Sequence, residues 1–238
     1  AGIILKIDQS GKFAYAGTQE AGTEQIVRVA LESEEDVTSL LNGDRSCSIL
    51  DISKDQIVYS VANFNQPPEL FTSDLNGSHE TRLTGLNDDF LKQFNLPVTE
   101  RLLFKSVDGE QVEGWISLPP VGKAPYPTIL YIHGGPHSAF GCNFSLDFQM
   151  LGGAGFAVLF INHRASTGYG DKFATAIKGD WGNLDYNDLM AGVDYAIEKG
   201  FADPDRLGCC GLSGGGNLSC WIVGHTDRFK VAVPENPV

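Results

Sequence analysis

The chain has 238 residues, of which 42% are hydrophobic, and this composition is typical of a soluble globular protein with one large domain or two smaller ones. Seventeen lysine and arginine residues against thirty aspartate and glutamate residues give a formal net charge of -13 at pH 7. This acidity argues against nucleic acid and anionic membrane surfaces as partners.

The sequence shows neither a transmembrane helix nor a signal peptide, because it has no run of 18 or more apolar residues and no basic N-terminal segment before an apolar core. The five cysteines are an odd number without metal-ligand spacing, which favours a reducing compartment. Cys209 and Cys210 are expected to be small buried core residues rather than a redox pair. We therefore expect a cytoplasmic protein without a metal.

The first ninety or so residues contain short strand-like runs separated by polar turns, at residues 13–17, 25–30, 57–62 and 69–73. Tyr15 and Tyr59 are 44 residues apart, a spacing within the range of a β-propeller blade. The same offset relates Ile26 to Leu70 and Val27 to Phe71. Because a propeller closes only with four or more blades, residues 1–95 are predicted to be the final blades of a partial propeller. Ala1 is not expected to be a natural domain start.

After a polar linker at residues 86–97, strands and helices alternate. A hairpin is predicted from residues 101–106 and 111–118, around the turn signal Asp108-Gly109. Buried strands are predicted at residues 127–132, 156–161 and 206–210, and helices at residues 146–151, 184–199 and 217–223. A turn at residues 203–205 would precede the third strand, and residues 231–238 predict one more strand, cut off. This alternation predicts a mostly parallel sheet covered by helices.

The pentapeptide at residues 211–215, Gly-Leu-Ser-Gly-Gly, fits the pattern G-x-S-x-G of a nucleophile elbow. In such an elbow a serine occupies a tight turn between a strand and a helix, and the glycines avoid collisions with both. A glycine-rich turn around a serine is also a common loop, but here a predicted strand precedes it and a predicted helix follows. Ser213 is therefore the candidate nucleophile, on strained backbone at the apex of the turn.

A second signal, His133-Gly134-Gly135-Pro136, directly follows the predicted strand at residues 127–132. Acyl-transfer enzymes need fixed N–H dipoles where negative charge develops on the attacked carbonyl, usually from the residue after the nucleophile and from an HGG-type loop. The predicted oxyanion donors are the N–H groups of Gly135 and Gly214, directed into one space beside Ser213 Oγ.

Together these segments resemble the prolyl oligopeptidase family, in particular its acylaminoacyl peptidases and related dipeptidyl peptidases. The segments are residues 134–136, 162–170, 179–182 followed by 185–186 and 188–189, and 224–229. The resemblance implies a β-propeller that gates an α/β-hydrolase domain, a serine mechanism with Ser213 as nucleophile and Gly135 and Gly214 as oxyanion donors, and short peptides as substrates. The chain departs from the family pattern at Gly214, where tyrosine is usual, and at Ala165, where glycine is usual.

A serine nucleophile needs a histidine base and an acid that orients it, and in this fold the acid and then the histidine follow the serine. His225 lies twelve positions along the helix from Ser213, roughly 18 Å at about 1.5 Å per residue, which is too far. His133, His137 and His163 are instead expected to fix their own loops, and Asp227 is expected to be a helix-end or ion-pair residue rather than the triad acid. We therefore expect that the triad Asp and His are not present in these residues.

The sequence thus predicts a partial β-propeller over residues 1–95 and an α/β-hydrolase catalytic domain over residues 96–238, incomplete after the strand that follows the nucleophile helix. The favoured function is a serine hydrolase that cleaves short or N-acylated peptides through an acyl-enzyme on Ser213, with these residues inactive alone. Two alternatives stay open: a carboxylesterase on the same fold, and a catalytically dead fragment or non-catalytic interaction protein. A peptide substrate and a homo-oligomer are the partners considered, and no cofactor is expected.

Overall fold

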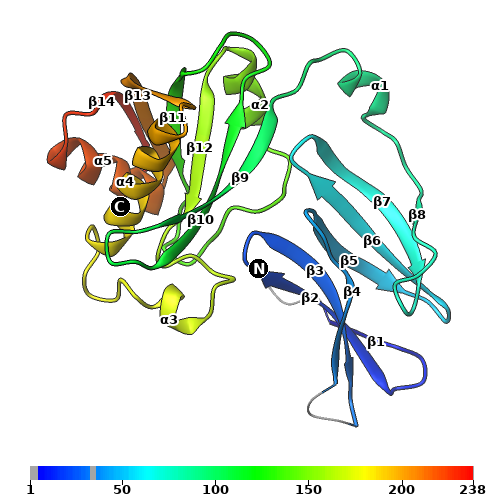
Figure 1. The fold of residues 1–238 in the computed structure, drawn as a ribbon. Coiled ribbons are helices and arrows are strands. Elements are labelled where there is room, and N and C mark those ends of the chain that lie inside the picture. Colours follow the sequence, from blue (N-terminus) through cyan, green and yellow to red (C-terminus); the bar gives the residue numbers. More distant parts are fainter. Residues whose placement is uncertain (1–4, 33–35, 238) are drawn as a thin grey trace. The chain divides into compact units, whose positions relative to one another are not determined.

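The computed structural model describes residues 5–32 and 36–237. The chain forms two compact units, which Figure 1 colours along the sequence. The N-terminal unit extends to Phe94 and includes Gly141–Phe144, whereas the C-terminal unit consists of Asn95–Phe140 and the residues from Ser145 onward. Each unit has its own apolar core.

The N-terminal unit is an all-β sheet. Its strands are β1 (Leu5–Ile7), β2 (Phe13–Glu20), β3 (Thr23–Ala30), β4 (Val37–Leu41), β5 (Ser46–Ile52), β6 (Gln56–Asn63), β7 (Gln66–Asp74) and β8 (Thr81–Arg82). Strands β1 to β4 and strands β5 to β8 form two antiparallel sets, which one parallel pair between Glu24 and Ser46 joins. The predicted linker contains a one-turn helix, α1 (Asp88–Leu91).

The predicted 44-residue repeat holds for the two tyrosines. It is wrong by one residue for the residues that pair with them on the next strand. Tyr15 and Tyr59 are both buried in the same apolar cluster. Tyr15 pairs with Arg28 across the sheet, but Tyr59 pairs with Phe71, one residue earlier than the 44-residue offset requires. Since neighbouring residues of a strand face opposite sides, this shift reverses the faces. The pairs Ile26 with Leu70 and Val27 with Phe71 are therefore not equivalent, and Leu70 is exposed where Ile26 is buried.

The C-terminal unit is a mixed six-stranded sheet with helices, as the alternating pattern predicts. Its strands are β9 (Val98–Lys105), β10 (Gln111–Leu118), β11 (Tyr126–Ile132), β12 (Ala157–Asn162), β13 (Ala202–Leu212) and β14 (Phe229–Glu235), in the order β14-β13-β11-β12-β10-β9. The four strands from β14 to β12 are parallel, and the β9–β10 hairpin joins β12 antiparallel. The helices are α2 (Leu146–Gly153), α3 (Asp171–Ala174), α4 (Leu184–Glu198) and α5 (Gly214–His225).

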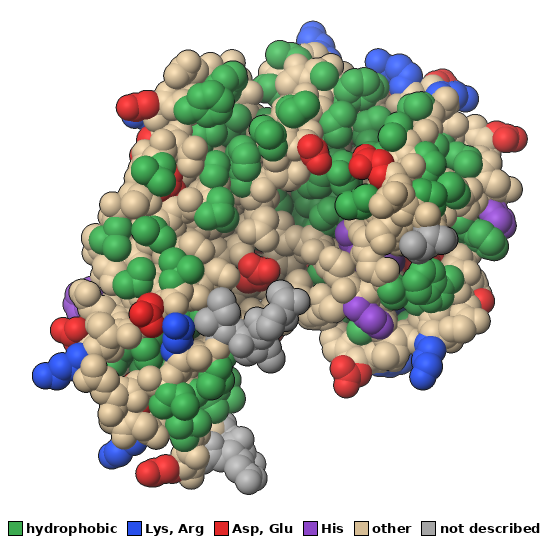
Figure 2. Space-filling view, turned by 180° about the vertical axis from the view of Figure 1, so that it is seen from behind, with side chains coloured by type: hydrophobic (Ala, Val, Ile, Leu, Met, Phe, Trp, Pro, Cys, Tyr) green, Lys and Arg blue, Asp and Glu red, His purple; other side chains and the backbone are tan. Residues whose placement is uncertain are grey.

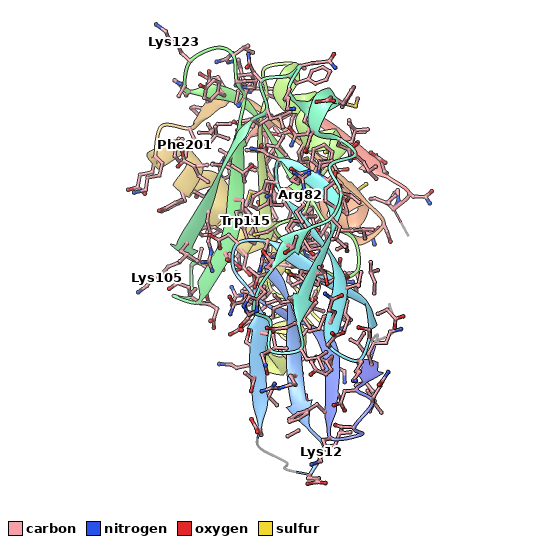
Figure 3. The ribbon with its side chains drawn as sticks, turned by 90° about the vertical axis from the view of Figure 1, so that its right-hand side faces the viewer. Lys12, Arg82, Lys105, Trp115, Lys123 and Phe201 are labelled. Atoms are coloured by element: carbon pink, nitrogen blue, oxygen red, sulfur yellow. The ribbon has the colours of Figure 1, made fainter. Side chains whose placement is uncertain are left out.

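The centre of this sheet is apolar on both faces, because every residue of β12 is buried. Trp115 of β10 stacks on Phe160 of β12 with ring centroids 5.6 Å apart. Figure 3 shows Trp115 among the strands, while Lys105 and Lys123 project outward from the ends of the hairpin region. Figure 2 shows that hydrophobic side chains are also exposed in patches at the surface. On this unit they include Leu146, Met150, Val231 and Val233.

The turn expected at residues 203–205 is instead part of β13. Asp205 N–H donates to Asp203 Oδ1 at 2.9 Å, which is the local hydrogen bond of an Asx turn. The strand accommodates this turn as an irregularity, because its pairing with β11 jumps from Ala202 to Leu207. The predicted turn chemistry is present, but it bends a strand rather than preceding one. The last strand also lies earlier than predicted, at Phe229–Glu235, and Val238 lies outside the described residues.

Candidate active site

Ser213 occupies the junction between β13 and α5, as the elbow pattern predicts (Figure 1). Its backbone has φ 58° and ψ −116°, a conformation that costs energy for any residue with a side chain. Two hydrogen bonds hold it: Ser213 N–H donates to the carbonyl of Glu235 at 2.9 Å, and Asn217 N–H donates to the carbonyl of Ser213 at 3.0 Å. The hydroxyl of Ser213 has no hydrogen-bond partner among the residues that the structure describes.

The flanking glycines are required because the turn leaves no space for side chains. A Cβ on Gly211 would lie 2.5 Å from the carbonyl oxygen of Ile132, and a Cβ on Gly215 would lie 2.2 Å from the same atom. Both distances are far inside van der Waals contact. The two glycines therefore let the start of α5 pack directly against the end of β11, and this packing explains the G-x-S-x-G spacing in physical terms.

The loop after β11 brings Gly135 next to Gly214. A Cβ on Gly214 would lie 3.1 Å from Gly135 N and 3.0 Å from Gly135 O, so a side chain here would press on the loop. Gly135 has φ 128°, and its own Cβ would meet His137 N at 2.7 Å. Within the described part of the chain, neither the Gly135 nor the Gly214 N–H group has an acceptor. Two free N–H groups thus lie close together beside Ser213, one of them at the positive N-terminal end of α5.

His133 is held by both of its ring nitrogens. Its Nδ1 lies 2.7 Å from the carbonyl oxygen of Gly134, which can only accept, so Nδ1 carries the proton of the neutral ring. Nε2 lies 2.8 Å from the hydroxyl of Ser166, whose single proton also has the carbonyl oxygen of His163 as an acceptor at 2.6 Å. Burial, together with the smaller effect of the neighbouring His163, lowers the pKa of His133 to about 3. His133 is therefore engaged in fixing its loop and is not free to take a proton from Ser213.

In the described part of the chain, none of the other histidines is hydrogen-bonded to the Ser213 hydroxyl, and neither is Asp227. His163 is buried and directs Nδ1 to the carbonyl of Arg164 at 2.8 Å. His225 lies at the far end of α5 and stacks on Trp221. His137 and Asp227 are both exposed. Asp227 lies two residues beyond the last residue of α5, as a helix-end residue would, and it makes no ion pair among the described residues.

An ion-pair network next to the site was not predicted from the sequence. Arg164 follows β12 and makes four hydrogen bonds to the buried carboxylate of Asp188 on α4, with its backbone N–H, with Nε to both oxygens, and with Nη2. It also contacts Asp108 in the β9–β10 turn and donates to Ser106 at 3.1 Å. Burial alone would lower the pKa of the Arg164 guanidinium, but the hydrogen bonds to Asp188 and Asp108 raise it. This network fixes the loop that contains His163 and Ser166.

The cysteines next to the elbow carry no reactive chemistry. Burial raises the pKa of the Cys209 thiol to about 11 and that of Cys210 to about 12, so both stay protonated at neutral pH. None of the five cysteines forms a disulfide in the described part of the chain. Among the residues that the structure describes, no cluster of three potential metal ligands occurs. No helix in the described ranges has both the length and the apolar character needed to span a membrane.

The fold and the site define a mixed α/β protein with a serine on a strand-to-helix elbow beside two free backbone N–H groups. The family profile of the prolyl oligopeptidase family, Peptidase S9, matches residues 142–238. Residues 142–238 therefore belong to this family of serine peptidases.

Individual relatives agree with that assignment. Over 184 residues, or 76% of this chain, it is 42% identical to the uncharacterized peptidase YuxL of Bacillus subtilis. Over 113 residues, or 47% of the chain, it is 42% identical to the acylamino-acid-releasing enzyme of Arabidopsis thaliana. The solved structure of uncomplexed Pyrococcus horikoshii acylaminoacyl peptidase superposes on 99% of the chain with a TM-score of 0.89 at 26% identity.

The chain spans only part of each of these proteins: 28% of the B. subtilis protein, 15% of the A. thaliana protein and 37% of the P. horikoshii structure. The match to that structure includes the N-terminal all-β sheet, which is consistent with a portion of a propeller. The family match lies in the C-terminal part of the chain.

Proposed function

We propose that the full-length protein is a serine peptidase that hydrolyses short or N-acylated peptides, with Ser213 as its nucleophile. The observation that carries the proposal is the strained elbow of Ser213 beside the unpaired N–H groups of Gly135 and Gly214. A backbone conformation of this cost persists only where the surrounding structure imposes it, and such positions cluster at active sites.

In the proposed reaction, Ser213 Oγ attacks the carbonyl carbon of the substrate while a base takes the hydroxyl proton. Negative charge then develops on the carbonyl oxygen, where the Gly135 and Gly214 N–H groups donate to it. The tetrahedral intermediate collapses to an acyl-enzyme as the base returns the proton to the leaving amine. Water subsequently attacks the acyl-enzyme, and Ser213 is regenerated.

The proposal assigns the acid and the base of the triad to parts of the full-length protein outside residues 1–238. Two facts support this assignment. No histidine that the structure describes is hydrogen-bonded to Ser213, and both ring nitrogens of His133 are occupied by other groups. The relatives are also several times longer than the matched segment. The 238-residue chain alone should therefore lack general-base catalysis.

We further propose that the C-terminal unit is an α/β-hydrolase catalytic domain and that the N-terminal unit is the last two blades of a β-propeller. The two four-stranded antiparallel sets in the N-terminal unit have the strand number of propeller blades. A propeller that gates the site would admit short peptides and exclude folded proteins, which favours peptides over the esters that a carboxylesterase takes.

Hydrolysis by the full-length protein tests this proposal directly. We expect release of p-nitroaniline from acyl-amino-acid and acyl-peptide anilides, and labelling of Ser213 by a fluorophosphonate probe. Ser213→Ala should abolish both. The 238-residue chain should label only slowly, since loss of the triad leaves a residual of about 10³- to 10⁴-fold over water.

The substrate panel separates the alternatives. Faster turnover of p-nitrophenyl esters than of any peptide substrate would favour a carboxylesterase. Absence of both hydrolysis and labelling in the full-length protein would indicate a non-catalytic protein. Rapid labelling of the 238-residue chain would mean that a group within it activates Ser213, and the assignment of the base would be wrong.

A further inference from the structure

A small cavity lies next to the elbow, within the C-terminal unit. Its volume is about 10 Å³, close to the least that can hold one water molecule. Gly214 and His133 of the proposed oxyanion site form part of its wall, together with apolar side chains that include Pro136 and Leu218. His163 and Asp185 complete the lining with polar atoms.

His163 presents an unpaired acceptor at this cavity. Its Nδ1 faces the carbonyl oxygen of Arg164 at 2.8 Å, so Nδ1 is the protonated nitrogen of the neutral ring and Nε2 carries the lone pair. The side chain is buried, and Nε2 has no hydrogen-bond partner among the residues that the structure describes. A buried polar atom left in this way is costly unless a water molecule or another group forms a hydrogen bond with it.

Asp185 presents a second acceptor at the same cavity. Its Oδ1 accepts the N–H groups of Gly182 and Tyr186, both at 2.9 Å, and so begins helix α4. Its Oδ2 is buried and, like His163 Nε2, lacks a partner in the described part of the chain. Two residues that line the cavity, from different elements, thus each have one buried acceptor without a partner in the described part of the chain.

One water molecule matches this pair, because it has two O–H donors and needs two or more polar partners to be held in a protein interior. We propose that a single water molecule is bound in the cavity, donating one hydrogen bond to His163 Nε2 and the other to Asp185 Oδ2, and that these two side chains are positioning residues for the oxyanion donors. The water site stands on the geometry alone. The positioning role rests on the proposed function of Ser213.

The contacts of the two side chains explain how they position the site. The ring of His163 stacks on that of His133, which is held to the carbonyl of Gly134 directly before Gly135. Asp185 fixes the loop at Gly182 and the first turn of α4. The bound water thus joins the segments of His163 and Asp185, and Gly214 lies in the wall of the same cavity.

A structure of the full-length protein at a resolution that shows ordered water tests the site itself. We expect one water oxygen within about 2.7–3.2 Å of both His163 Nε2 and Asp185 Oδ2. A direct hydrogen bond between the two side chains, or a cavity without density, would overturn the water site.

Kinetics test the positioning role. His163→Phe keeps an aromatic ring against His133 but removes Nε2, and we expect kcat to fall about 10- to 100-fold while KM changes less than twofold. Asp185→Asn keeps Oδ1 as an acceptor for Gly182 and Tyr186, and its amide can donate to the water, which still donates to His163. This conservative variant should retain kcat within about threefold.

Each kcat is divided by the number of sites that a fluorophosphonate probe labels, so partial unfolding does not count as a catalytic loss. His225→Phe, at an exposed histidine on α5, is the matched control and should behave as the wild type. Wild-type kcat per labelled site in His163→Phe would show that the positioning role is wrong. If the wild type neither hydrolyses substrate nor labels, the proposed function and the positioning role fail, while the ordered-water experiment still decides the water site.

Discussion

The imidazole ring of His163 lies flat against that of His133, with centroids 4.5 Å apart and planes inclined by 10°. Both rings are buried, and neither has a carboxylate partner among the described residues, so two histidines share an environment that resists protonation. Burial lowers the pKa of His163 to about 4 and that of His133 to about 3, where the adjacent His163 contributes as well. Through this pair, the stability of the segment that contains the proposed oxyanion loop should depend on pH.

This stacked pair predicts a loss of stability on acidification. An unfolded histidine binds its proton near pH 6.5, whereas these folded ones do so only below about 4. Between these values the unfolded state binds more protons, so the free energy of unfolding should fall as pH falls, by at most about 1.4 kcal/mol per pH unit for each histidine. Urea unfolding from pH 7 to pH 4.5 measures the slope. His163→Phe should make it shallower, and an unchanged slope would contradict the prediction.

Substitution of Gly215 by alanine should destabilise the C-terminal unit. The new Cβ would lie 2.2 Å from the carbonyl oxygen of Ile132, so either β11 or α5 must move, at a cost of about 1–3 kcal/mol. Gly224→Ala is the matched control in the same helix, since nothing lies within 4 Å of its Cβ. It should be neutral or stabilising by up to about 1 kcal/mol. Thermal unfolding compares the two variants, and equal melting temperatures would show that the elbow tolerates a side chain.

The strain at Ser213 can be measured by comparing two inactive variants. Ser213→Ala keeps a Cβ at φ 58°, whereas Ser213→Gly removes it. Left-handed backbone costs residues with a Cβ roughly 1–2 kcal/mol, so the glycine variant should be the more stable of the two, although glycine's larger unfolded-state entropy offsets part of the gain. Urea unfolding of both variants gives the difference. A more stable alanine variant would mean that the elbow stores no such strain.

Substitution of Gly135 should act on activity more than on binding. Alanine keeps the N–H group, but at φ 128° its Cβ would meet His137 N at 2.7 Å, so the loop must move. Proline deletes the N–H donor and cannot adopt this φ, so Gly135→Pro should show the largest loss of kcat. We expect kcat to fall up to about 10²- to 10³-fold, the usual effect of one lost oxyanion donor.

Gly155→Ala is the matched control for the Gly135 variants, because Gly155 also has a positive φ, 89°, with nothing within 4 Å of its Cβ. This variant should lose some stability through backbone strain and keep wild-type kcat. Wild-type kcat in both Gly135 variants would identify Gly135 as a turn residue without a catalytic part.

The two arginine–aspartate pairs of helix α4 should differ sharply in their contribution to stability. Asp188 is buried and carries the charge that balances buried Arg164, so Asp188→Asn should cost about 3–5 kcal/mol. Asp194 pairs with Arg228 at the surface, and Asp194→Asn should cost less than about 1 kcal/mol. Urea unfolding of both variants measures the contrast. Similar losses of stability in both variants would show that the charge of Asp188 does not compensate that of buried Arg164.

The elbow could be predicted from the sequence because the residues that mark it are contiguous in the chain. Two glycines around Ser213, with a strand before and a helix after, leave few conformations, and the structure has that turn. The same holds for the β9–β10 hairpin, whose turn residues Asp108 and Gly109 are adjacent in the chain. Where the residues that mark a turn are contiguous in the chain, periodicity and turn chemistry suffice to predict the local structure.

Features that depend on tertiary pairing could not be predicted in this way. The bond between Arg164 and Asp188 joins a loop to a helix 24 residues later, and no spacing rule relates the two. The one-residue error at Leu70 arose because register depends on how β6 and β7 pair. The sequence predicts the turn at Asp203 from its residue types. Only the pairing of β13 with β11 shows that the strand continues through this turn.

The hydrogen bond from Ser213 N–H to the carbonyl of Glu235 gives the elbow a place in the order of folding. Glu235 ends β14, which pairs with β13 in parallel and therefore forms only after α5 has crossed over between them. Contacts of this kind form late, because a loop must close before they contribute. During synthesis Ser213 should thus reach its final backbone conformation only when β14 has docked. Until then a nascent chain would not expose the Ser213 hydroxyl in its elbow conformation to other proteins.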